Sequence, residues 1–185
     1  MKKELKHICP AIFPQPVILI ATYNEDGSVD VMNAAWGTPH DMNEIKLNIS
    51  EGHKTTKNIR RTGCFSVTVA TEKHMKEADY FGIVSGNNVK DKFARSGIKA
   101  HHSEIMEAPI LDDYPICMEC VVKECSDEYG VLGVIKRLSV DEEYLDGDKV
   151  NLEKMRIICY DPFNHGYYVV GEKVGQAFSI GKEVK

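Results

Sequence analysis

Short apolar segments separated by turn residues dominate the hydrophobic pattern of this chain, and most of them predict β-strands. Residues 17–22 are almost continuously apolar and rich in β-branched side chains, which is typical of a buried strand. Residues 24–28 contain an Asp-Gly turn signal, and a second strand pattern follows over residues 28–35, so the two segments predict a hairpin. Apolar and polar residues alternate over residues 45–50, which predicts a third strand with one polar face.

Further strand patterns occupy the rest of the chain, together with a few short helices. Strands are expected over residues 65–69, 116–125, 131–140, 156–160 and 167–170. Helical patterns cover residues 55–61 (with Gly63 as a stop signal), the spacing from Met75 to Phe81, and part of residues 87–97. The pattern therefore predicts roughly eight strands and two or three helices.

No β-α-β alternation is present, so a parallel doubly wound sheet is not expected. We expect a mainly β (α+β) protein, an antiparallel barrel closed on itself with a few short flanking helices. No internal repeat, low-complexity segment or linker interrupts the pattern. Residues 1–185 are therefore expected to form a single domain.

Composition and charge exclude several classes of partner. Hydrophobic residues make up 43% and charged residues 28% of the chain, which is typical of a globular protein. The formal net charge of −5 argues against nucleic acid or an anionic membrane as the main partner, because both require a basic surface. No apolar run approaches the roughly 20 residues that span a bilayer. We expect a cytoplasmic protein.

The six cysteines are scattered, and most lie in apolar runs. Such residues behave as small hydrophobic side chains in a reducing compartment. Cys117 and Cys120 match C-x-x-C, but no second pair of ligands has the spacing of a zinc site, so no metal is expected. Motifs of serine hydrolases, P-loop proteins, Rossmann dehydrogenases and zinc proteases are also missing.

The most informative segment is residues 50–59, where a strand ends, Gly52 allows a turn, and a helix begins. The first turn of a helix carries unpaired backbone N–H groups and a partial positive charge, so it suits an anion. Side chains that add donors or positive charge at this turn are those of His53, Lys54, Thr55 and Thr56. This combination predicts a binding site for a phosphate monoester.

Two further segments are candidates for contact with a planar ligand. The first is Asn33-Ala34-Ala35-Trp36, where small side chains let the backbone approach a flat ring and Trp36 supplies an aromatic contact. Alternatively, Trp36 fills the core at a tight strand end. The second is Lys92, a cation that would favour the reduced, anionic form of a planar redox ring. Alternatively, Lys92 is a surface lysine on a capped helix.

Taken together and in order, these segments resemble the flavin reductase-like family, FMN-binding split-barrel proteins that include flavoredoxins. The resemblance covers most of the chain, and its segments are residues 16–19, 33–36, 54–59, 91–93 with Gly97, 109–111, 119–122 and 141–142, followed by Tyr160, Tyr167 and Gly171. It implies an FMN-binding split β-barrel that forms a homodimer and holds FMN close to the subunit interface.

The resemblance also implies roles for individual residues. Asn33, Ala34, Ala35 and Trp36 match the strand end that borders the isoalloxazine ring. Ser50, His53, Lys54, Thr55 and Thr56 match the phosphate-binding turn. Lys92 matches a lysine near the flavin in flavoredoxin-like members, and Phe163 matches a C-terminal aromatic that approaches the ring from the partner subunit.

The activity implied is that of an FMN-dependent oxidoreductase that takes electrons from NADH or NADPH. The electrons would pass to free flavin, a metal complex or a redox partner protein. Many members carry a Gly-Asp-His motif, but the corresponding residues 126–134 contain no histidine. This departure supports an alternative, a flavoredoxin-like electron carrier without NAD(P)H activity that docks on a basic partner. A split barrel that has lost FMN is a third interpretation.

Overall fold

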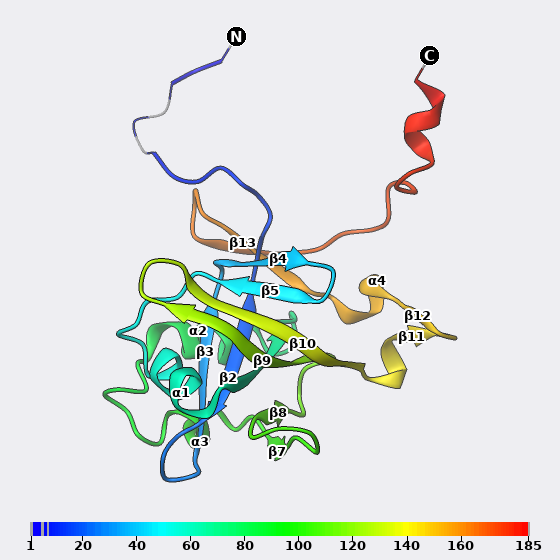
Figure 1. The fold of residues 1–185 in the computed structure, drawn as a ribbon. Coiled ribbons are helices and arrows are strands. Elements are labelled where there is room, and N and C mark those ends of the chain that lie inside the picture. The colour runs from blue at the N-terminus through cyan, green and yellow to red at the C-terminus, as the bar shows by residue number, and fades with distance from the viewer. Residues whose placement is uncertain (1, 5, 7, 185) are drawn as a thin grey trace.

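A curled antiparallel sheet of seven strands forms the centre of the molecule (Figure 1). The computed structural model describes residues 2–4, 6 and 8–184. The strands of this sheet are β2 (Ile18–Tyr23), β3 (Val29–Ala34), β4 (Gly37–Asp41), β5 (Glu44–Leu47), β6 (Cys64–Val69), β9 (Ile116–Ser126) and β10 (Gly130–Val140). Their spatial order is β3-β2-β6-β9-β10-β5-β4, and every pairing is antiparallel.

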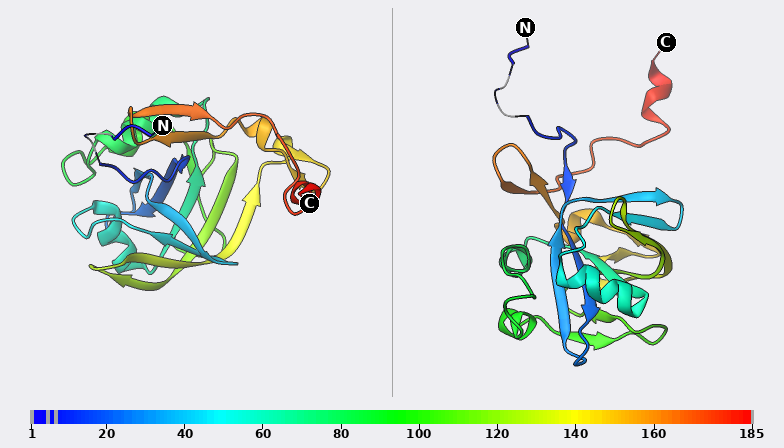
Figure 2. Two further views of the ribbon diagram at one scale, coloured as in Figure 1. Left: turned by 90° about the horizontal axis from the view of Figure 1, so that it is seen from above. Right: turned by 60° about the vertical axis from the view of Figure 1, so that its left-hand side comes forward.

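The sheet curls towards a barrel but does not close (Figure 2, left). Within the described residues, β3 pairs with β2 alone and β4 with β5 alone. The expectation of a barrel closed on itself is therefore wrong, whereas the mainly β, antiparallel split-barrel architecture is confirmed. Only Ala35 and Trp36 separate the two edge strands, so the edges come together at that point without a ladder between them. Alternation of polar and apolar residues carries no information about which edges pair.

Three smaller sheets complete the β structure. One has the order β1-β13-β14, formed by β1 (Gln15–Pro16), β13 (Ile158–Asp161) and β14 (Gly166–Val169). The others pair β7 (Ala100–His102) with β8 (Pro109–Leu111) and β11 (Leu145–Asp146) with β12 (Lys149–Val150). The sequence pattern predicts β13 and β14 but places them in the barrel. The short strands were missed because two or three residues are too few to show alternation.

The helices are short and flank the sheet. They are α1 (Lys54–Thr62), α2 (Met75–Ile83), α3 (Lys92–Ser96) and α4 (Leu152–Met155), with 3₁₀ turns at Glu142–Tyr144 and Ile180–Glu183. Helix α1 ends as predicted, because Gly63 adopts φ 72° and donates its N–H to the Ile59 carbonyl over 2.9 Å. Among the described residues, every helix is too short or too polar to cross a membrane.

Strand β2 is buried on both faces and separates two hydrophobic cores. Leu19 and Ala21 face one core, which also contains side chains from α2 and β13. Ile18 and Ile20 face the other core, which lies within the curl of the sheet. Because successive side chains of a strand point to opposite faces, a strand between two cores must be apolar throughout. This position explains the continuous apolar run that marks β2 in the sequence.

Both ends of the chain extend from the same end of the molecule (Figures 1 and 2, N-terminus blue and C-terminus red). Ile8, Val174 and Phe178 on these segments are 94%, 91% and 99% exposed.

Candidate functional site

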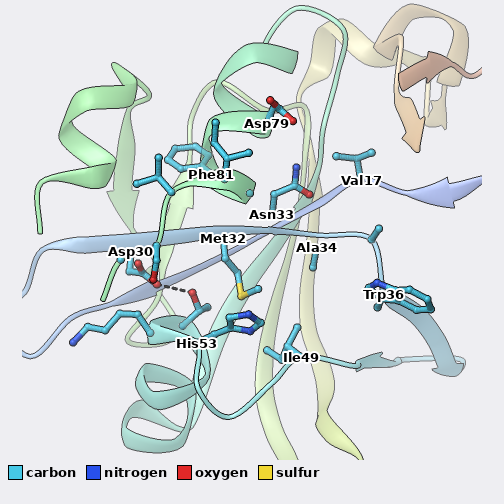
Figure 3. A pocket seen from close by; sticks show the side chains of 18 of the residues that line it. Val17, Asp30, Met32, Asn33, Ala34, Trp36, Ile49, His53, Asp79 and Phe81 are labelled. Carbon is cyan, nitrogen blue, oxygen red and sulfur yellow. Dashed lines mark hydrogen bonds between the residues drawn. The ribbon is translucent and has the colours of Figure 1, made fainter. Parts of the chain in front are cut away.

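A cavity of about 550 Å³ lies along β3, at the open edge of the sheet. Its volume falls within the roughly 300–1,000 Å³ typical of small-molecule sites. Because β3 is an edge strand, side chains from both of its faces reach the cavity. Asp30, Met32 and Ala34 lie on one face and Asn33 on the other, and Figure 3 shows them in sequence along the strand.

One end of the cavity is the start of helix α1. His53 and Lys54 line it, and no side chain caps the helix at His53. The amide of Lys57 donates to the His53 carbonyl over 3.2 Å, which is the first bond of the helix. The amides of residues 54–56 consequently have no partner among the described residues. This end therefore offers several backbone donors and one lysine to an anion, as the sequence predicts for this turn.

The two threonine hydroxyl groups of this turn are already engaged. Thr55 donates to Asp30 Oδ2 over 2.6 Å, and Thr56 donates to the Ser50 carbonyl over 2.7 Å. Thr55 lines the cavity, whereas Ser50 and Thr56 do not. Ser50 and Thr56 shape the turn, and of the predicted phosphate donors the backbone amides and the side chains of His53 and Lys54 remain available at the cavity.

The loop after α2 packs against the same turn. Ser85 and Gly86 line the cavity, and the side-chain Nδ2 of Asn87 donates to the Gly52 carbonyl over 3.0 Å. The Lys57 ammonium group lies 3.4 Å from Asn87 Oδ1. Asn87 thus ties this loop to the residues on either side of the helix start.

The other predicted contacts with a planar ring lie further along the same wall. Ala34, Ala35 and Trp36 line the cavity, and the two alanines contribute only small side chains to its wall. Asn33 donates to the Ala78 carbonyl over 2.9 Å, which fixes the strand to α2. Trp36 is 52% exposed, so the alternative that it fills the core is wrong. Figure 3 shows Trp36 and Asp30 at opposite ends of this wall.

A tyrosine and an aspartate form a hydrogen bond at the cavity. The Tyr167 hydroxyl on β14 donates to Asp79 Oδ1 on α2 over 2.8 Å, and both residues line the cavity. Burial, with the neighbouring Asp79 carboxylate, raises the pKa of Tyr167 to about 12. The phenol therefore keeps its proton at neutral pH and can act as a hydrogen-bond donor.

Lys92 lies in the cavity wall but is almost completely buried. Its Nζ atom donates to the Phe81 carbonyl over 2.9 Å and lies 5.7 Å from the centre of the Phe81 ring. Burial lowers the pKa of Lys92, and the negative charge of Asp30 opposes that shift. The alternative of a surface lysine is therefore wrong.

Phe163 is not part of this cavity. It is partly exposed and lines a separate shallow pocket with Phe13 and Tyr168, beside the small β1-β13-β14 sheet. A role of Phe163 at the ring would thus require a second copy of the chain, as the resemblance implies.

Cys117 and Cys120 are buried in β9, and burial raises the pKa of each thiol to about 12. Both thiols are therefore protonated at neutral pH and poorly suited to redox or metal chemistry.

Several cavity residues were missed by sequence reasoning, among them Asp30, Asp79 and Phe81. Asp30 had a detectable signal, because it is a charged residue between Val29 and Val31 in a predicted strand. Asp79 and Phe81 had none beyond helical spacing.

A family model described as "Flavin reductase like domain" matches residues 11–152. The chain belongs to this family. Among solved structures, it is similar to flavoredoxin of Desulfovibrio vulgaris (Miyazaki F), with 30% identity, a TM-score of 0.92, and coverage of 98% of this chain and 100% of the other. Flavoredoxin from Methanosarcina acetivorans is 26% identical, with a TM-score of 0.86 and coverage of 99% and 100%.

More distant solved structures share the fold. Nitrilotriacetate monooxygenase component B from Bacillus cereus is 17% identical, with a TM-score of 0.76 and coverage of 90% of this chain and 89% of the other. At this identity the comparison shows the fold alone. No curated protein sequence gives a significant match to the chain.

Proposed function

We propose that the cavity binds FMN and that the protein is an oxidoreductase that passes electrons from NADH or NADPH through FMN to an acceptor. The observation that carries this proposal is the composition of the single cavity along β3. Unpaired amides and Lys54 at the start of α1 suit a phosphate, while the backbone at Ala34 and Ala35 suits a flat ring. Membership of the family supports the same ligand.

The residues fit FMN in their chemistry. The amides of residues 54–56 and the Lys54 ammonium group donate to the phosphate, where positive charge and the helix start act together. Asn33 and the backbone of Ala34 and Ala35 contact the edge of the ring. FMN supplies the redox chemistry when bound, and the protein supplies position and electrostatics.

At the end of the cavity near Ala34, Ala35 and Trp36, which would hold the isoalloxazine ring, the side chains leave room for an electron donor. Trp36 is half-exposed and offers an aromatic surface against which a nicotinamide can pack. Tyr167 holds its proton at neutral pH next to Asp79, so it presents a neutral polar group to the cavity. Hydride transfer needs no further acid or nucleophile from the chain.

The test is an anaerobic titration of the purified protein loaded with FMN. The visible spectrum establishes binding, and NADH and NADPH are then added separately. Bleaching of the flavin at a catalytic rate by either nucleotide is the expected result. A colourless preparation that takes up no added FMN would remove the proposal entirely.

The second candidate function is an electron carrier without NAD(P)H activity. It is favoured by the turn between β9 and β10, residues 127–129, which contains no histidine and does not line the cavity. In this case FMN bleaches with dithionite but not with NADH or NADPH. The acidic net charge of −5 suits docking to a basic redox partner.

We also propose that the protein is a homodimer. A mostly apolar groove of about 690 Å³, lined in part by Ile12 and Val170, adjoins the cavity and shares Ala35, Trp36 and Asn48 with it. The two terminal segments, which carry exposed apolar side chains, extend from the same end of the molecule (Figure 1). A second copy of the chain that covers this end of the molecule would border the part of the cavity that would hold the isoalloxazine ring.

Light scattering during size-exclusion chromatography tests the dimer. The expected mass is twice the 20.8 kDa of the chain. Removal of residues 172–185 should shift the protein towards the monomer, because it removes Val174 and Phe178. A monomer at all concentrations would contradict this proposal.

A further inference from the structure

A buried carboxylate lies beside the proposed anion site, where a negative charge is unexpected. Asp30 is only 4% exposed, lines the cavity, and accepts the hydrogen bond from Thr55 (Figure 3, dashed line). A carboxylate at this place repels a phosphate group, and its burial is costly without compensation. Its presence therefore requires an explanation that a simple phosphate site does not give.

Part of the compensation comes from Lys92. Both side chains lie in the cavity wall with 4% exposure, and their opposite charges attract each other. Asp30 forms no direct ion pair with the described residues, and the Lys92 ammonium group donates to the Phe81 carbonyl instead. The wall thus holds a separated pair of buried charges, and the Asp30 carboxylate keeps unused acceptor capacity.

The Thr55 hydroxyl group cannot donate a hydrogen bond to a bound anion. A carboxylate only accepts hydrogen bonds, so the proton of the Thr55 hydroxyl points at Asp30 Oδ2. The hydroxyl oxygen then presents lone pairs to the rest of its surroundings. Asp30 and Thr55 together form a region of acceptors next to the donors at the start of α1.

The second carboxylate oxygen, Oδ1, accepts no side-chain hydrogen bond like the one that Thr55 donates to Oδ2, and among the described residues it is not one of the fully enclosed polar atoms that lack a partner. It lies against Gly86, where an added Cβ atom would approach Oδ1 to 2.3 Å. The absence of a side chain at residue 86 therefore makes room for this oxygen. A ligand that brings a hydroxyl group to this point would satisfy the free acceptor.

We propose that Asp30 is a specificity residue that accepts hydrogen bonds from the hydroxyl groups of a polyol phosphate, here the ribityl chain of FMN. The inference rests on the proposed binding of FMN. A ligand with hydroxyl groups beside its phosphate offsets the repulsion by Asp30. A ligand with phosphate alone meets that repulsion and leaves the carboxylate unpaired, so the site rejects it.

The test compares two ligands that differ in these hydroxyl groups. One is FMN, and the other is a flavin whose ring and phosphate are joined by an unsubstituted pentyl chain. Dissociation constants are measured from the change in flavin fluorescence, without turnover. The wild-type protein should bind FMN at least about tenfold more tightly, which corresponds to the loss of one hydrogen bond to a charged group.

Two variants separate a direct contact from a structural role. Asp30→Asn should weaken FMN binding and leave or improve binding of the pentyl flavin, so the preference for FMN falls about tenfold or more. Thr55→Val is the matched control, because it removes the hydrogen bond from Thr55 to residue 30 but keeps the charge of Asp30. It should change the affinity for both ligands by a similar factor.

The outcomes are distinct. Equal binding of the two flavins by the wild-type protein overturns the role of Asp30 while FMN binding stands, even where the variants fail to fold. The same shift for both ligands in Asp30→Asn, as in Thr55→Val, also overturns it, because Asp30 then acts only through Thr55. Binding of neither flavin by the wild-type protein removes both this inference and the proposed function.

Discussion

The hydroxyl group of Thr56 donates a 2.7 Å hydrogen bond to the carbonyl oxygen of Ser50, which closes the turn before α1. Thr56 is buried, and its side chain faces the protein and not the cavity. The position of the first-turn amides therefore depends on a side chain that does not contact the proposed ligand.

Replacement of Thr56 with valine should lower the free energy of unfolding by about 1 kcal/mol, because it removes one buried hydrogen bond. It should also weaken FMN binding, since the amides of residues 54–56 lose their fixed position. Thr56→Ser, which keeps the hydroxyl group, is the control and should restore FMN affinity. Chemical denaturation and FMN titration measure the two effects. If Thr56→Val had the same free energy of unfolding and the same FMN affinity as the wild-type protein, this hydrogen bond would not position the turn.

Lys54 is expected to act on the phosphate alone. Lys54→Met should raise the FMN dissociation constant about tenfold and reduce its dependence on salt, because a charge-assisted contact is lost. Binding of riboflavin, which has no phosphate, should not change. Lys76→Met, at an exposed position on α2, is a control with the same change in net charge. An equal loss of riboflavin affinity would place Lys54 elsewhere on the flavin.

The strand pattern was predictable because it is local. Strands such as β2 and β9 follow from runs of neighbouring residues, and the end of α1 follows from Gly63 alone. The turn before α1 and the start of that helix were predictable for the same reason, because residues 50–56 are contiguous.

The contacts that complete the cavity connect distant residues. Thr55 and Asp30 are 25 positions apart, and Tyr167 and Asp79 are 88 positions apart. Such contacts depend on which strands pair and where the sheet stays open, and the hydrophobic pattern contains neither fact. The pattern also does not reveal that the hydroxyl groups of Thr55 and Thr56 form hydrogen bonds within the protein.

The organisation of residues 1–185 as a single domain stays a prediction.

The raised pKa of Tyr167 should be measurable by titration of its phenol group. Its pKa in the folded protein, about 12, is above the ordinary value of 10.0, so its contribution to stability is complete below pH 10 and is lost as pH rises towards 12. In a difference titration at the ultraviolet absorbance of tyrosinate, wild type minus Tyr167→Phe should show one phenol with a midpoint near 12.

The stability of the two proteins gives an independent check on Tyr167. The wild-type protein should lose more stability than Tyr167→Phe between pH 10 and 12, because the folded state holds the phenolic proton more tightly than the unfolded state. A phenol that titrates near pH 10 in the folded protein would contradict the buried contact with Asp79.

The central claim is that the start of α1 binds the phosphate of FMN, and a crystal structure with FMN tests it most directly. The account predicts phosphate oxygens at hydrogen-bond distance, about 2.7–3.2 Å, from backbone nitrogens within residues 54–56, with the ring against Ala34 and Ala35. FMN bound with its phosphate away from this helix start, or no FMN in the cavity at saturating concentration, would contradict the account.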